Sequence, residues 1–273
     1  MTAFFFARAF HPRMTTTITS THNPRIRSLR KLRDRGHRAE QGLFMAEGED
    51  MLAAALAAGT PPRSVFAVPD PPAPLADLLE RVPAGVERIT ASHEALAAAG
   101  SLGSGSRVVG LWELPDLGTI EPVTRAGPVL YLHDVADPGN VGTILRAARA
   151  FGAPLVVLSE RAADPFGPKA VRAGMGAIFG QRLARTELGA TRTALGEHRA
   201  IALVPGAGAP LREAPLGGRV LFVLGAERSG LAPELVAECD LEAHVPVDRE
   251  AAESLNVAMT ATLCLYEYRA RHG

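Results

Sequence analysis

The sequence predicts an α/β protein in two parts: a small N-terminal α/β part and a larger C-terminal part built on a mainly parallel sheet. Short apolar runs alternate with helical segments along most of the chain, which is typical of layered α/β folds. The apolar run 129–135 is broken only by His133, as expected for a strand that helices cover on both faces. Between the parts, residues 115–127 are rich in proline and glycine and have the composition of a linker.

The bulk composition fits such a protein. The chain has 273 residues, which is enough for two domains. Its 29 basic and 29 acidic residues exclude a protein that coats RNA with a uniformly basic surface. Residues 1–17 hold no apolar run long enough for a signal or a membrane span, so we expect a loose tail, with Met14 as an alternative start, and no membrane partner. Cys239 and Cys264 lie far apart, and we expect both to be buried thiols of a cytoplasmic protein.

Residues 18–114 are predicted to form the N-terminal domain. We expect it to begin with a helix over 23–38, in which Ile26, Leu29 and Leu32 recur at helical spacing and can be buried. Strands are then expected at 43–46, 64–68, 86–90 and 107–113, and helices at 49–58, 74–81 and 92–99. This alternation is similar to that of small RNA-binding domains in ribosomal proteins.

Positive charge is concentrated in the first predicted helix. Seven basic residues lie between His22 and Arg38 against the single acid Asp34, without the alternating signs of an ion-paired helix. The chain has only two lysines, so nearly all of its positive charge is guanidinium, which suits bidentate phosphate contacts. A solvated charged face is the alternative, but the lack of acids favours contact with an RNA backbone. The residues expected to contact RNA are Arg25, Arg27, Arg30, Lys31 and Arg33.

Residues 128–273 form the predicted C-terminal domain. After the strand at 129–135, further strands are expected at 155–158, 182–185, 200–204, 220–224 and 243–247. Helices are expected at 140–151, with Asn140 as its cap, and at 169–175, 187–197, 233–238 and 254–271.

Two strand exits near the end of the chain predict a ligand pocket. Gly225 follows one predicted strand directly, and Val245-Pro246-Val247 ends the next. A glycine at a strand exit lets backbone amides come close to a ligand. Ser254 and Asn256 stand at the start of the last predicted helix, which they can cap while they face the pocket. These residues alone leave the ligand open.

Three motifs stand in order along the C-terminal part: Asn140-Val141-Gly142-Thr143-Ile144-Leu145-Arg146, Gly225-x-Glu227-x-x-Gly230-Leu231 and Ser254-Leu255-Asn256-Val257. Together they resemble the SpoU/TrmH family of RNA ribose 2′-O-methyltransferases, which use S-adenosylmethionine. Each motif alone is weak, but three in order at suitable spacing are specific. The resemblance is strong over 126–273 and looser over 18–114, which is similar to the family's substrate-binding domain.

The resemblance implies a trefoil-knotted C-terminal domain of the SPOUT type, paired as a homodimer through the last helix. Knots are very rare, and periodicity cannot reveal one. For the dimer, the last helix offers an apolar stripe that core packing explains equally well: Leu255, Met259, Thr262, Leu263 and Tyr266. The implied contacts with S-adenosyl-L-methionine are Val204, Gly206, Gly225, Gly230, Val245, Val247 and Leu255. The family commonly has a glycine shortly after this proline motif, and residues 245–250 lack it.

The resemblance also implies that Asn140, Arg146, Glu227, Ser254 and Asn256 serve methyl transfer. Alignment of the reactants is worth roughly 7–11 kcal/mol in such a displacement, whereas a positioned base gives roughly 3–5 kcal/mol. Groups that clamp ribose and phosphate should therefore dominate. A guanidinium stays protonated, so Arg146 suits gripping phosphate and stabilising alkoxide charge better than acting as a base. Glu227 is expected to orient Arg146 or to accept a proton.

Other functions fit the sequence less well. The loop Pro205-Gly206-Ala207-Gly208 mimics the start of an oxidoreductase dinucleotide loop, but it lacks the third glycine and runs into Pro210. A non-catalytic RNA-binding protein of the same fold is a second alternative, which the intact motifs disfavour. No metal is expected, since no His, Cys or carboxylate pair has convincing ligand spacing. Within the family, the added N-terminal domain favours rRNA over tRNA, and a tRNA 2′-O-methyltransferase is the remaining alternative.

Overall fold

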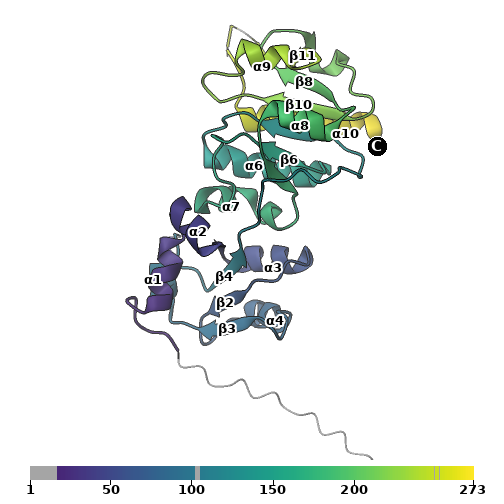
Figure 1. The fold of residues 1–273 in the computed structure, drawn as a ribbon. Helices are drawn as coiled ribbons and strands as arrows, with labels where there is room; N and C mark the ends of the chain where they lie inside the picture. The colour runs from purple at the N-terminus through teal and green to yellow at the C-terminus, as the bar shows by residue number, and fades with distance from the viewer. Residues whose placement is uncertain (1–16, 102–104, 249, 252) are drawn as a thin grey trace, which may run out of the picture.

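The computed structural model describes residues 17–101, 105–248, 250–251 and 253–273, which form two β-sheets one above the other in Figure 1. The first sheet has four strands in the order β1-β4-β2-β3, and the second has seven in the order β7-β6-β5-β10-β8-β11-β9. The predicted α/β fold class is confirmed. The predicted tail lies outside the described residues, apart from Thr17.

The N-terminal sheet is mixed. Its strands are β1 (Leu43–Glu47), β2 (Ser64–Ala67), β3 (Glu87–Thr90) and β4 (Val108–Glu113). β4 pairs antiparallel with β1 and β2, while β2 and β3 run parallel. The helices are α3 (Glu49–Ala57), α4 (Ala73–Glu80) and α5 (His93–Ala99). All of these elements start and end within a residue of the bounds that the sequence pattern predicts.

The single helix predicted over 23–38 is wrong, because two short helices occupy this region. α1 (Pro24–Lys31) ends before its C-cap Leu32, and α2 (Arg35–Gln41) follows. Asp34 causes the break, since its carboxylate accepts a hydrogen bond from the backbone N of His37 at 2.9 Å and so starts a new helix. The predicted apolar face of α1 is buried all the same.

The C-terminal sheet is parallel in all of its pairings. Its strands are β5 (Val129–Leu132), β6 (Val156–Leu158), β7 (Leu183–Arg185), β8 (Arg199–Leu203), β9 (Ala209–Pro210), β10 (Val220–Leu224) and β11 (Leu241–His244). β5 ends three residues earlier than predicted, because the chain turns at Asp134 with φ 52°. Leu224 of β10 lies opposite Leu132 of β5, so these two strands end side by side.

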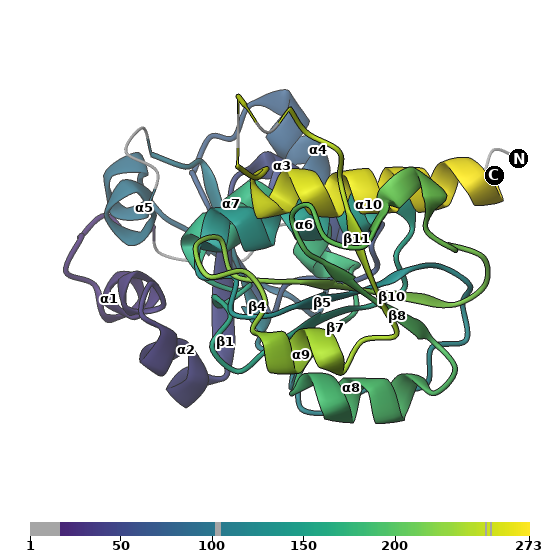
Figure 2. The same cartoon turned by 90° about the horizontal axis from the view of Figure 1, so that it is seen from above.

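Helices cover both faces of this sheet (Figure 2), with α6, α7 and α10 on one face and α8 and α9 on the other. Their bounds are α6 (Pro138–Phe151), α7 (Pro168–Gly174), α8 (Leu188–Leu195), α9 (Pro233–Ala237) and α10 (Val257–His272), with short 3-10 turns η1 (Ala177–Phe179) and η2 (Leu211–Glu213). Gly142 lets α6 approach α7, because a Cβ there would lie 2.2 Å from the carbonyl oxygen of Ala170. No helix in the described part of the chain could span a membrane.

An aromatic cluster joins the two sheets. Phe44 of β1 and Trp112 of β4 pack against Phe179 of η1, with ring centroids 6.1 and 4.6 Å from it. Phe166 packs 5.0 Å from Phe44, and the Trp112 indole N–H donates to the carbonyl of Thr60 at 2.9 Å. One continuous buried core therefore runs from the N-terminal sheet into the C-terminal one.

Both cysteines are free thiols, but they differ in burial. Cys264 of α10 is fully buried, as expected. Cys239 is only partly buried, so the expectation for it was wrong: it follows the short helix α9, which buries no residue completely. Even so, burial raises the pKa of the Cys239 thiol to about 11.

Two buried tyrosines allow a test of this packing. The hydroxyl of Tyr131 is fully buried and has no hydrogen-bond partner among the described residues, whereas that of Tyr268 donates to the carbonyl of Gly218 at 3.0 Å. We expect Tyr131→Phe to leave the free energy of unfolding unchanged or to raise it by about 1 kcal/mol, and Tyr268→Phe to lower it by about 1 kcal/mol. Urea unfolding of both variants measures this. Equal losses in the two would show that the Tyr131 hydroxyl has a partner after all.

Candidate functional site

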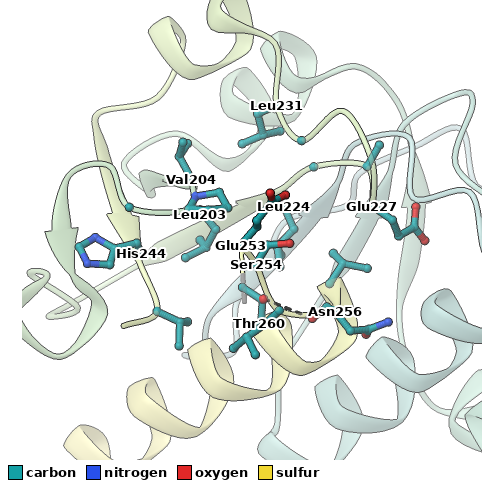
Figure 3. Close-up of a pocket in the computed structure, with 18 of the residues that line it drawn as sticks. Leu203, Val204, Leu224, Glu227, Leu231, His244, Glu253, Ser254, Asn256 and Thr260 are labelled. Carbon is teal, nitrogen blue, oxygen red and sulfur yellow. Dashed lines mark hydrogen bonds between the residues drawn. The ribbon is translucent and has the colours of Figure 1, made fainter. Parts of the chain in front are cut away.

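A cavity of about 680 Å³ opens where β8, β10 and β11 end (Figure 3). Its walls are the loops 203–206, 224–231 and 244–247, together with the segment 253–257 that leads into α10. Ligands of open parallel sheets bind at this edge, outside the carboxyl ends of the strands. All seven predicted cofactor contacts line the cavity: Val204, Gly206, Gly225, Gly230, Val245, Val247 and Leu255.

Two glycines shape the wall after β10. A Cβ on Gly225 would lie 2.3 Å from the backbone carbonyl carbon of Gly230, so only glycine lets this loop fold back on itself. Gly230 has φ 65°, in the left-handed region, and its N–H donates to the carbonyl of Ala226 at 2.9 Å. The loop between them is thereby closed, and it holds Glu227 at the cavity wall.

Glu227 joins this loop to the start of α6. One of its carboxylate oxygens accepts from the side-chain N–H of Asn140 at 2.8 Å and from the backbone N of Asp137 at 3.2 Å. The other accepts from the backbone N of Ala136 at 3.1 Å. Burial works to raise the pKa of Glu227, but these hydrogen bonds hold that pKa below its usual value. The carboxylate is therefore ionised at neutral pH and serves as an acceptor.

Asn140 also contacts the third motif. The side-chain N–H of Asn256 donates to the side-chain oxygen of Asn140 at 3.0 Å. The side-chain oxygen of Asn256 accepts from the backbone N of Ala258 at 2.8 Å, which caps α10. Hydrogen bonds thus link Glu227, Asn140 and Asn256, so the three sequence motifs meet at one place.

Two capping predictions were wrong. Asn140 is the third residue of α6, and Asp137 caps that helix by accepting from the backbone N of Gly139 and Asn140. The side chain of Asn140 is therefore left to contact Glu227. Ser254 lies before α10 rather than in it, and lines the cavity without capping the helix.

Arg146 stands apart from this network. It lies on the exposed face of α6, and its side chain has no hydrogen bond or ion pair within the described part of the chain. It does not line the cavity, and Glu227 contacts Asn140 instead of Arg146. The expectation that Glu227 orients Arg146 thus has no contact to support it. The guanidinium is free to bind an external anion.

Sequence reasoning missed Asp137. Besides capping α6, its carboxylate accepts from the ammonium of Lys169 at 2.8 Å, and this contact together with its backbone hydrogen bonds lowers its pKa. The signal was present, since an Asp followed by Pro138 marks a helix start. The loop before α6 is therefore held from both sides, by Asp137 and by Glu227. Among the residues described, no cluster of three or more His, Cys, Asp or Glu could hold a metal ion.

The five predicted RNA contacts divide into two groups. The guanidinium of Arg30 donates to the carbonyl of Ala98, and that of Arg33 donates to Ala99, so both tie the α1 region to α5. Arg25 forms an exposed ion pair with Glu87 at 2.8 Å. The remaining two, Arg27 and Lys31, are exposed and have no side-chain partner among the described residues.

Two family models match the chain. Residues 127–266 match the SpoU rRNA Methylase family, and residues 23–108 match the MRM3-like substrate binding domain. The 23S rRNA (guanosine(2553)-2′-O)-methyltransferase RlmP of Bacillus subtilis is 28% identical over 92% of this chain and 98% of its own length. The Uncharacterized tRNA/rRNA methyltransferase slr1673 of Synechocystis is 31% identical over 93% of each chain.

Solved structures agree with these matches. The AdoMet-bound rRNA methyltransferase of Sinorhizobium meliloti has a TM-score of 0.83 at 28% identity, over 93% of this chain and 97% of its own. The SpoU methyltransferase AviRb of Streptomyces viridochromogenes, in complex with AdoMet, has a TM-score of 0.82 at 26% identity, over 92% and 98%. Both likenesses cover more than nine tenths of this chain. The chain therefore belongs to the SpoU rRNA Methylase family.

Proposed function

We propose that this chain is an S-adenosylmethionine-dependent RNA 2′-O-ribose methyltransferase that acts on ribosomal RNA. The observation that carries the proposal is the hydrogen-bonded link of Glu227, Asn140 and Asn256 at the rim of a cavity whose loops match the family's cofactor motifs. The relatives named above support the reaction and the cofactor, since they include a 23S rRNA 2′-O-methyltransferase and two AdoMet-bound structures.

The cavity fits the proposed cofactor. Its volume of about 680 Å³ lies within the roughly 300–1,000 Å³ of small-molecule sites. Apolar Val245, Val247 and Leu255 offer surface for an adenosine, and the backbone of the Gly225 loop offers hydrogen bonds to it. When bound, S-adenosylmethionine supplies a methyl group on a positively charged sulfonium.

The ribose is proposed to lie on the α6 side of the cavity. Its 2′-oxygen takes the methyl group while the carbon–sulfur bond breaks, and the hydroxyl proton leaves to water. Arg146 grips the neighbouring phosphate and stabilises the charge that develops on the oxygen. Glu227 holds Asn140 and the start of α6 in place through its hydrogen bonds. Ser254, at the cavity wall, positions the ribose.

The N-terminal domain, 18–114, is proposed to bind the RNA substrate, with 115–127 as the linker. Exposed Arg27 and Lys31 on α1 are its best phosphate contacts, because no acid of this chain pairs with them in the described structure. The relatives named for rRNA favour that substrate over tRNA. A tRNA substrate and RNA binding without catalysis are the alternatives that the experiments below distinguish.

A homodimer through α10 is also part of the proposal, as are the trefoil knot and a cytoplasmic location. Met259, Leu263 and Tyr266 are 61%, 38% and 57% exposed and follow one another at helical spacing, which leaves an exposed apolar face beside the contact of Tyr266 with Phe151. A second copy of the chain would cover it. Leu255 and Thr262 are not part of this exposed face, since Leu255 lines the cavity and the Thr262 hydroxyl bonds the carbonyl of Ala258.

Transfer of labelled methyl from S-adenosylmethionine tests the function directly. We expect label in unmodified rRNA and, after alkaline hydrolysis, in alkali-resistant dinucleotides, because a 2′-O-methyl group blocks the hydroxyl attack that cleaves RNA. Unmodified tRNA and a reaction without RNA are the controls. Label in mononucleotides would mean base methylation, label in tRNA alone would change the substrate, and RNA binding without label would leave a non-catalytic protein.

Arg146→Ala and Arg149→Ala form a matched pair on α6. Arg149 donates to the carbonyl of Gly180 at 2.7 Å, so its role is structural, whereas Arg146 has no partner in the described structure. We expect Arg146→Ala to lower kcat by about 10²–10³-fold, with S-adenosylmethionine affinity unchanged. Arg149→Ala should keep kcat within about threefold and lower only stability. Equal kcat losses would remove the special role of Arg146.

Leu263→Glu tests the dimer. We expect this variant to be a monomer by light scattering at a concentration where the unaltered chain is a dimer, because a carboxylate would be buried in the apolar interface. Met175→Glu is the matched control, since Met175 is 49% exposed but lies at the end of α7 and not on α10. An unaltered chain that is a monomer would refute the proposed dimer.

A further inference from the structure

Arg38 is a buried arginine in the N-terminal part of the chain. The residue is only 3% exposed, although it belongs to a run of basic residues in the sequence. One terminal nitrogen donates to the carbonyl of Leu32 at 2.7 Å and to that of Arg33 at 2.9 Å. The other donates to the carboxylate of Asp164, which belongs to the C-terminal part. This guanidinium therefore joins the two parts of the chain.

In the N-terminal part of the chain, the hydrogen bonds of Arg38 hold the break between α1 and α2. Leu32 caps the end of α1, and Arg33 follows it. The carbonyls of these two residues are the acceptors for Arg38, so Arg38 holds the backbone at the end of α1, while Arg30 and Arg33 tie the same region to α5. α1 carries Arg27 and Lys31, two exposed basic residues that have no side-chain partner in the described structure.

In the C-terminal part of the chain, the acceptor of Arg38 is Asp164, which lies in the loop 159–167 after β6. The guanidinium of Arg185 donates to the carbonyls of Ser159 and Ala162 at 2.6 and 3.0 Å, which fixes this loop on the sheet. The backbone N of Ala163 donates to the carbonyl of Val135 at 2.9 Å. Val135 directly precedes Ala136, one of the residues that Glu227 holds. A path of hydrogen bonds and adjacent backbone residues thus runs from the end of α1 to the rim of the cavity.

From this geometry we propose that Arg38 is a positioning residue, which fixes the RNA-binding helix α1 relative to the methyl-transfer site. The proposal rests on the function proposed above. Two contact regions on one RNA strengthen each other only when their spacing is set, because a fixed spacing raises the effective concentration of the second contact. A loosened α1 would still carry its positive charge but would add less to RNA affinity.

The choice of arginine at this buried position supports a positional role. Burying a charge is unfavourable, and an apolar side chain of similar size would usually pack as well or better. Arginine offers a planar fork of donors that can engage three acceptors in fixed directions at once. Here those acceptors are two carbonyls on one side and the Asp164 carboxylate on the other. These directional hydrogen bonds fix the orientation of the α1 end relative to the Asp164 loop, and apolar packing would fix that orientation less well.

The chain contains its own reporter for this contact. Asp164 accepts from the backbone N of Phe166 at 2.9 Å, and Phe166 packs in the aromatic cluster that contains Trp112. Trp112 is the one tryptophan of the sequence and is 5% exposed. Its emission therefore reports on the junction between the sheets, whether or not RNA is present.

The test compares Arg38→Met with the unaltered chain. We expect Arg38→Met to weaken binding of an rRNA fragment about tenfold and to raise the RNA KM equally, while kcat and S-adenosylmethionine affinity stay unchanged. The emission of Trp112 should shift to the red. Arg38→Lys should recover part of the RNA affinity, since it keeps the charge but cannot reach all three acceptors. Asp164→Asn should resemble Arg38→Met, because it removes the charged acceptor.

Leu75→Ala is the control for a merely structural effect. Leu75 is fully buried in α4, within the N-terminal part and away from the junction. This variant should lower the urea midpoint but keep RNA affinity and the Trp112 emission in the absence of urea. Unchanged RNA affinity in Arg38→Met, or an equal loss in Leu75→Ala, would overturn the positioning role alone. An unaltered chain that binds no RNA would overturn the proposed function, and the positioning role with it.

Discussion

The carboxylate of Glu227 is the contact on which the site geometry depends. It accepts hydrogen bonds from two backbone amides and from the side chain of Asn140, all in the segment that follows β5. The register of β10 against β5 makes this possible, since Leu224 and Leu132 are paired and the two strands end together. Asn140 then accepts from Asn256, so the last helix is tied to the same place. The ionised carboxylate of Glu227 thus joins the loop after β10 to the segment after β5 and, through Asn140, to the start of α10.

The same contact limits the chemistry that Glu227 can perform. Its hydrogen bonds lower its pKa although partial desolvation opposes them, so the carboxylate keeps its charge at neutral pH and is a weak base. Because the pKa of Glu227 is lower in the folded state, its hydrogen bonds contribute to stability at pH values above the usual pKa. This contribution is lost as the pH falls through the lowered pKa. An orienting role therefore suits Glu227 better than proton acceptance. Charge on the ribose oxygen must then be stabilised elsewhere, which agrees with the proposal for the unpaired Arg146.

Sequence patterns predicted most of the fold, and the errors have local physical causes. Apolar runs marked the buried strands well, because β5 and β10 are covered on both faces. The prediction of one long first helix was wrong at Asp34, and the prediction that Asn140 caps α6 was wrong because Asp137 does so. In both places a carboxylate accepts from backbone N–H groups, and hydrophobic periodicity does not reveal such a contact. The candidate site was predicted through its three motifs. Its internal bonds were not, because which of Asn140 and Arg146 reaches Glu227 depends on the rotation of α6.

That rotation also explains why Arg146 is separated from the cavity rim. Six residues along an α-helix turn the side chain by about 240°, so Asn140 and Arg146 cannot both face Glu227. The helix is not free to turn, because Gly142 lets it lie directly against Ala170 of α7, and Asp137 fixes its first turn through Lys169. Asn140 is therefore committed to the protein side and Arg146 to solvent. In the proposed reaction the two faces of α6 therefore have different roles. The inner face holds Asn140 against Glu227, and the outer face presents the free guanidinium of Arg146 to RNA.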